Sequence, residues 1–86
     1  MKKLYLSYNN ITNEYCLDGG IYGRNRSILK LRDNKMLPAL KKELNLKRKT
    51  ELYVSEEIEK HIISGLENIL ENSKIKMKVV KDLREY

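Results

Sequence analysis

A cluster of cations near the middle of the chain is the strongest chemical signal in the sequence. Five basic side chains fall within nine residues: Lys41, Lys42, Lys47, Arg48 and Lys49. Cations at a helix end complement the partial negative charge of its last carbonyl groups, which explains part of the cluster. The remaining charge is typical of a surface that contacts phosphate groups or an acidic protein. A solvated surface without a ligand is the alternative.

This cluster belongs to a longer basic segment, residues 24–49, which holds ten basic and two acidic side chains and therefore carries a formal charge of +8. The whole chain of 86 residues carries +6, and residues 50–72 alone sum to −5. Such a concentration of positive charge predicts an anionic partner. It does not decide between a nucleic acid and an acidic protein.

A glycine-rich stretch at residues 19–27 is a second candidate site. Glycines allow a backbone to approach a ligand closely, and Arg24, Arg26 and Ser27 are side chains that can hold a phosphate or a carboxylate. The spacing fits neither a Walker A loop nor a dinucleotide-binding fingerprint. A hairpin turn followed by a bulge at Gly23 explains the same glycines without any ligand.

Residues that could support catalysis are few. His61 is the only histidine and has no cysteine or second histidine at the spacing of metal ligands. Cys16 is more typical of a small core residue than of a nucleophile, and helix capping explains the adjacent pair Glu56 and Glu57. We therefore expect no catalytic residues, no metal site and no cofactor, and we expect that the protein is not an enzyme.

The elements that must position these residues follow from the hydrophobic pattern. Alternation of apolar and polar residues predicts strands over residues 3–8, 14–17, 21–32 with an interruption, 51–54 and 74–80. Helical spacing predicts helices over residues 35–46 and 56–72. The order β-β-β-α-β-α-β favours a single α+β domain, residues 1–86. We expect a small mixed sheet of about four to five strands with both helices packed on one face, an antiparallel front and parallel later strands.

The helix at 56–72 has the clearest pattern. Ser55 is a suitable N-cap, and Gly65 is expected to allow a neighbouring strand to approach the helix. Residues 82–86 are expected to form a frayed tail. The apolar stripe of the helix consists of Ile58, Ile62, Leu66, Ile69 and Leu70.

The predicted strand register also leaves one sheet face polar. We expect that face to carry Lys3, Tyr5, Tyr53, Lys74, Lys76 and Lys78, with Lys30 and Arg32 as further members. Aromatic rings stack on unpaired bases and lysines follow phosphates, so this mixture is typical of single-stranded nucleic-acid binding. The expected sheet is similar to that of RRM domains, but no stretch matches their RNP motifs, and we assign no family. Lysines that keep an edge strand soluble are the alternative.

These observations favour a non-enzymatic module that binds RNA or single-stranded DNA. The residues expected at the interface are Arg24, Arg26, Arg48, Lys49, Tyr5, Tyr53, Lys74, Lys76 and Lys78. The alternative is a small inhibitor or adaptor that docks its basic face on an acidic or nucleic-acid-binding groove of a larger protein. In composition the chain resembles small proteins of phages and mobile elements, including inhibitors of host defence.

Two further expectations concern assembly and location. The acidic face of the 56–72 helix (Glu57, Glu59, Glu67 and Glu71) is typical of a solvated surface, and pairing with the basic segment of a second copy in a homodimer is the alternative. No apolar run approaches the ~20 residues needed to span a bilayer. Together with a single cysteine and the lack of a secretory signal, this favours an intracellular, cytoplasmic protein without a membrane partner.

Overall fold

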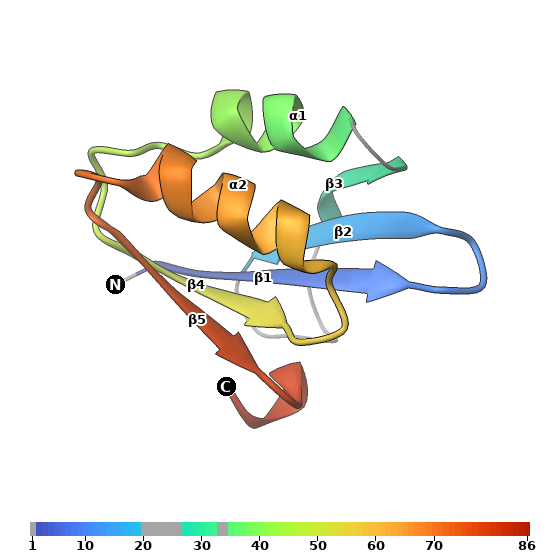
Figure 1. The fold of residues 1–86 in the computed structure, drawn as a ribbon. Helices are drawn as coiled ribbons and strands as arrows, with labels where there is room; N and C mark the ends of the chain where they lie inside the picture. The colour runs from blue at the N-terminus through green and yellow to red at the C-terminus, as the bar shows by residue number, and fades with distance from the viewer. Residues whose placement is uncertain (1, 20–26, 33–34) are drawn as a thin grey trace.

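The computed structural model describes residues 2–19, 27–32 and 35–86. Its elements in chain order are β1 (Lys2–Asn9), β2 (Glu14–Gly19), β3 (Ser27–Arg32), α1 (Met36–Glu43), β4 (Thr50–Ser55), α2 (Lys60–Leu70), β5 (Ile75–Val80) and the 3-10 turn η2 (Leu83–Glu85). Both helices lie on the same side of the sheet (Figure 1). The α+β class and the order of the five strands and two helices are therefore confirmed for the described residues.

The sheet has the spatial order β3-β2-β1-β4-β5. Strand β2 runs antiparallel to both β1 and β3, whereas β1 pairs parallel with β4 and β4 pairs parallel with β5. An antiparallel front and parallel later strands were both expected from the order of the elements. The N-terminal strand thus lies at the centre, where it joins the two halves.

The main core fills the space between the sheet and the helices. Alternate residues of each strand point to one face, so that the apolar set of β1, β2 and β4 meets the apolar stripes of both helices. The most deeply buried members of this core are Leu6, Leu17, Met36, Leu40, Leu52, Val54, Ile62 and Leu66.

Helix α2 begins four residues later than the sequence indicates. The Ser55 Oγ accepts a hydrogen bond from the Glu57 N–H (3.2 Å), and the Ile58 N–H donates to the Ser55 carbonyl (3.1 Å). Ser55 therefore caps a separate turn, and Glu59 occupies the N-cap position of the helix. Helix α1 is likewise shorter than predicted. The positions of both helices were right and their ends were wrong.

Gly65 permits a close approach, but the neighbour is a helix and not the expected strand. A Cβ atom at this position would lie 2.6 Å from Cδ1 of Leu37, which belongs to α1. That distance is too short for a real carbon–carbon contact. The glycine therefore allows α1 and α2 to pack closely over the sheet, despite a cost of about 1 kcal/mol in helix propensity.

The connection from β2 to β3 is described only at its ends. Asp18 and Gly19 continue β2, where the sequence predicts a turn, and the pairing of β2 with β3 shifts register between Leu17 and Asp18. Residues 20–26 lie outside the described residues. The predicted start of a strand at 21, the bulge at Gly23 and the anion-binding loop therefore remain predictions.

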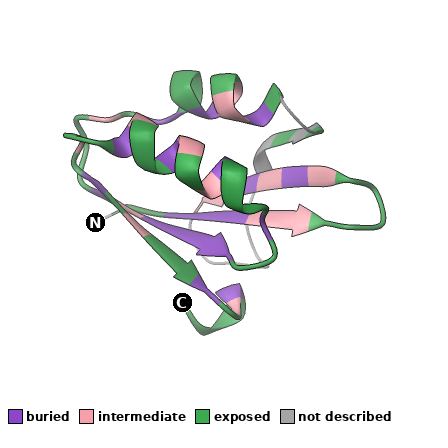
Figure 2. Ribbon diagram, viewed as in Figure 1, coloured by how far each residue is buried: buried purple, intermediate pink, exposed green. Residues whose placement is uncertain are grey.

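The sheet face opposite the helices is not uniformly polar. Strand β4 is buried along most of its length, whereas half of the residues of β5 are exposed (Figure 2). Tyr5, Tyr53, Val80 and Leu83 form a second apolar cluster on this face. The prediction of a frayed tail was wrong, because Leu83 at the start of η2 packs onto the sheet.

The fold predicts where a truncation is costly. Leu66 is fully buried between α2 and the sheet, so Leu66→Ala should lower the free energy of unfolding by about 2–5 kcal/mol. Lys76→Ala, at an exposed position, should change it by less than about 0.5 kcal/mol. Urea unfolding followed by circular dichroism measures both. A larger loss for the lysine variant would mean that the two faces of the sheet are assigned the wrong way round.

Candidate functional site

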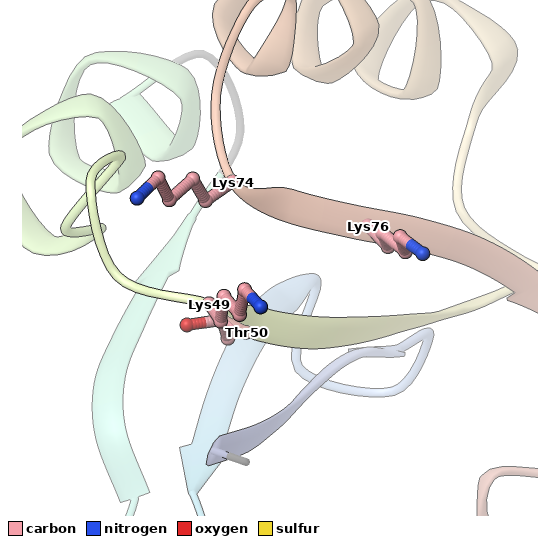
Figure 3. A pocket seen from close by; sticks show the side chains of 4 residues that line it. All are labelled: Lys49, Thr50, Lys74 and Lys76. Atoms are coloured by element: carbon pink, nitrogen blue, oxygen red, sulfur yellow. The ribbon is translucent and has the colours of Figure 1, made fainter.

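A hollow of about 240 Å³ lies where β4 and β5 begin, and it is lined by Lys49, Thr50, Lys74 and Lys76. Parallel pairing aligns Thr50 with Ile75, so the residues before them, Lys49 and Lys74, lie at the same edge of the sheet. Figure 3 shows the side chains of these residues around the hollow, with the ammonium groups of Lys49 and Lys76 on one side and that of Lys74 on the other. Three cations from two chain segments therefore share one depression.

Hydrogen bonds hold the two segments that carry these lysines in place. The Lys74 N–H donates to the Leu46 carbonyl (2.9 Å), which ties the start of β5 to the connection after α1. In that connection the Asn45 Oδ1 accepts from the Lys47 N–H (3.1 Å), and the Thr50 Oγ1 donates to the Arg48 carbonyl (3.1 Å). The basic connection and the start of β5 are thus held together as one surface.

We call this surface the basic end and define it as Lys47, Arg48, Lys49, Lys74 and Lys76. All five side chains are exposed. Among the described residues, the ion pairs are His61 with Glu59 and Arg84 with Asp82, and neither lies in the basic end. Glu51 is the register neighbour of Lys76, but its carboxylate accepts a hydrogen bond from the Tyr53 hydroxyl (2.8 Å). In the described part of the chain, no carboxylate therefore forms an ion pair with the basic end.

Two of the predicted binding residues are buried and not exposed as expected. Tyr5 and Tyr53 are on the sheet face opposite the helices, as their register predicts, but their exposed fractions are only 1% and 7%. Their rings stack on each other with centroids 5.7 Å apart. Residues after β5 cover them, so neither ring is open to a base in this structure. The prediction that both are surface residues was wrong.

Tyr86 extends this stack to the surface. Its ring centroid lies 4.9 Å from that of Tyr53, and 40% of the residue is exposed. The Lys78 Nζ lies 5.6 Å from the centre of the Tyr86 ring, and the Lys3 Nζ donates a hydrogen bond to the Tyr86 backbone oxygen (3.3 Å). An exposed aromatic ring with Lys78 beside it and Lys3 at its backbone is therefore present on this face, but the ring comes from the tail.

Tyr86 is not among the predicted binding residues, although the sequence contains a signal that the tail is ordered. Val80, Leu83 and Tyr86 are spaced by three residues, which is the period of a 3-10 helix. Three large apolar or aromatic residues at that spacing predict a short turn with one buried side. The sequence instead led us to expect a frayed tail over residues 82–86.

An acidic side chain fixes the turn that carries Tyr86. The Asp82 Oδ1 accepts hydrogen bonds from the Arg84 N–H and the Arg84 Nε, each at 3.0 Å, and Oδ2 accepts from the second guanidinium nitrogen at 3.1 Å. These hydrogen bonds with Arg84, first those of the side chain and then that of the backbone, hold the pKa of Asp82 below its ordinary value. In contrast, the hydrogen bond that the Tyr53 hydroxyl donates to Glu51 raises the pKa of that hydroxyl.

The other predicted site residues divide into three groups. Lys30 and Arg32 are exposed on β3, at the opposite edge of the sheet from β5, and so do not join the basic end. Arg24 and Arg26 lie outside the described residues. Lys41 and Lys42 occupy the last turn of α1, where they complement the helix C-terminus as the sequence indicates.

The described residues contain no cluster of three or more His, Cys, Asp or Glu side chains that would hold a metal ion. His61 is exposed, and its Nδ1 lies 3.1 Å from Glu59 Oε2. Burial raises the pKa of the Cys16 thiol, which disfavours the thiolate needed for nucleophilic attack. None of the helices in the described ranges combines the length and the apolar character needed to cross a bilayer.

A second hollow, of about 280 Å³, lies at the carboxyl ends of β1, β4 and β5. Its charged lining is of mixed sign, unlike that of the basic end. The lining residues are Ser7, Tyr8, Ser55, Glu57, Lys81, Asp82, Leu83 and Arg84.

Comparison with known proteins found no family model, no curated protein and no solved structure that matches this chain. The function therefore has to be argued from the residues themselves.

The Asp82–Arg84 contacts predict that the turn is sensitive to acid. Because the pKa of Asp82 is lower in the folded state, its stabilisation is present above the ordinary value of about 4 and is lost as the pH falls through the folded-state pKa. Asp82→Ala should therefore lower the free energy of unfolding at neutral pH but match the parent at a pH of about 2. Urea unfolding at both pH values measures this, and an equal loss at both would contradict the assignment.

Proposed function

We propose that this protein is a non-enzymatic module that binds RNA or single-stranded DNA through its basic end. One observation carries the proposal: Lys49, Lys74 and Lys76 surround a single hollow, and no carboxylate of the described residues forms an ion pair with them. Cations left unpaired in this way gain free energy from a phosphate backbone, because each contact releases condensed counterions.

The arrangement of lysines favours an extended partner. Lys76 and Lys78 alternate within β5 and share one side of the sheet, roughly 6.6 Å apart, and Lys74 immediately precedes the strand. A row of flexible ammonium groups follows a phosphate backbone without fixed geometry. A linear anion therefore fits this row better than a single compact ligand does.

Protection of the sheet edge explains only part of the charge. Strand β5 lies at one edge of the sheet, and exposed lysines there prevent pairing with other chains. This accounts for Lys76 and Lys78, which lie within the strand. It does not account for Arg48 and Lys49, which lie on the connection that precedes β4. Binding of an anion explains both groups together.

The salt dependence of binding tests the proposal. With about four or five phosphate contacts, a plot of log K against log salt for a single-stranded oligonucleotide should have a slope of about −3 to −4. The triple variant Lys49→Gln, Lys74→Gln, Lys76→Gln should bind more weakly, and its slope should be shallower by about 2. Fluorescence anisotropy with a labelled oligonucleotide at several salt concentrations measures both quantities.

A matched triple variant serves as the control. Lys35, Lys60 and Lys81 are exposed and follow the carboxyl ends of β3, β4 and β5, away from the hollow. Their replacement by Gln changes the net charge equally and should leave the slope almost unchanged. If both triple variants lose affinity equally, only net charge matters and the basic end is not a site. A partner that is captured from nuclease-treated lysate, with no binding to oligonucleotides, would instead favour the inhibitor or adaptor alternative.

A further inference from the structure

We infer that Tyr86 is the residue on which a nucleobase stacks, and that Lys78 and the basic end hold the phosphates on either side of that base. This inference rests on the proposed function and adds a base-binding position to it. Its basis is the juxtaposition of an exposed ring, a buried aromatic support and a row of lysines that ends beside the ring.

The support beneath Tyr86 is preformed. The Tyr53 ring stacks against Tyr86 with an angle of 28° between the ring planes, and Tyr5 supports Tyr53 in turn. The Lys3 Nζ and the Leu83 carbonyl each form a hydrogen bond with the backbone of Tyr86, at 3.3 Å. A ring held in this way loses little conformational freedom when a base stacks on it, which favours binding.

The lysine row gives the stacked base a route for its backbone. Lys78 is the register neighbour of Tyr53 and places its ammonium group near the Tyr86 ring. Lys76 follows on the same side of β5, and Lys76 and Lys74 both line the hollow at the start of β4. A strand whose base stacks on Tyr86 can thus place its next phosphates along these lysines. Stacking on aromatic rings combined with a basic track is how sequence-tolerant single-strand binders work.

The structure also offers a competing role for the same residue. Residues 83–86 cover Tyr5 and Tyr53, so they can act as a lid that keeps these rings from a ligand. The two roles predict opposite changes in affinity when the Tyr86 ring is removed. Loss of the Tyr86 ring weakens binding if the ring is the stacking surface, and it tightens binding if the ring only blocks Tyr53.

Substitution of Tyr86 tests the inference with an RNA oligonucleotide of about ten nucleotides. Tyr86→Ala should weaken binding about 5- to 150-fold and leave the slope of log K against log salt unchanged. Tyr86→Phe keeps the ring and should bind like the parent. Tighter binding by Tyr86→Ala would assign the lid role and overturn the inference. Unchanged binding by Tyr86→Ala would also overturn it.

A second measurement reports stacking directly. The chain contains no tryptophan, so Tyr86→Trp places a single indole reporter at this position. Its fluorescence should be quenched when the oligonucleotide binds, whereas unquenched emission at saturation would contradict stacking. Binding by the parent protein separates the two proposals. If the parent binds with the expected salt slope and substitution of Tyr86 does not change the affinity, only the stacking inference fails. If the parent binds no oligonucleotide at low salt, the proposed function fails and the inference with it.

Discussion

The parallel pairing of β1 with β4 is the constraint on which both faces of the molecule depend. Its register sets Leu4 beside Leu52 and Leu6 beside Val54 on the side covered by the helices. The same register sets Tyr5 beside Tyr53 on the other side. A shift by one residue would bring the tyrosines under the helices and expose the leucines, so the main core and the aromatic stack are formed together or not at all.

This arrangement separates the residues that stabilise this small domain from those that we propose bind a ligand. The helices bury one face, and the short turn after β5 needs only Leu83 and Tyr86 to cover the centre of the other. The edge strand β5 and the connection before β4 remain exposed, and their lysines are not needed to hold the core together. Such surface charges are largely free to serve a ligand, because surface ion pairs contribute little to stability.

Particular residues show what the sequence could and could not predict. Alternation over residues 74–80 predicted β5 and its exposed lysines correctly, but it failed at the end of the strand, where Val79 is exposed and Val80 is buried beneath Leu83. The same rule placed Tyr5 and Tyr53 on the correct face of the sheet but wrongly predicted that they are exposed. No local pattern in β1 or β4 indicates that residues 83–86 return to cover them. The predicted start of helix α2, directly after Ser55, was also wrong, because Ser55 caps a separate turn that precedes the helix. The basic end combines segments about 25 residues apart, Lys49 and Lys74, which only the pairing of β4 with β5 brings together.

Chemical-shift mapping by NMR tests the central claim most directly, because it locates a bound oligonucleotide residue by residue. Addition of a single-stranded RNA to the labelled protein should shift the signals of residues 47–50, residues 74–78 and Tyr86. The signals of the exposed acidic side of α2, including those of Glu67 and Glu71, should stay unchanged at the same concentrations. The largest shifts on α2 or on β3, with none at the start of β4 and β5, would contradict the account.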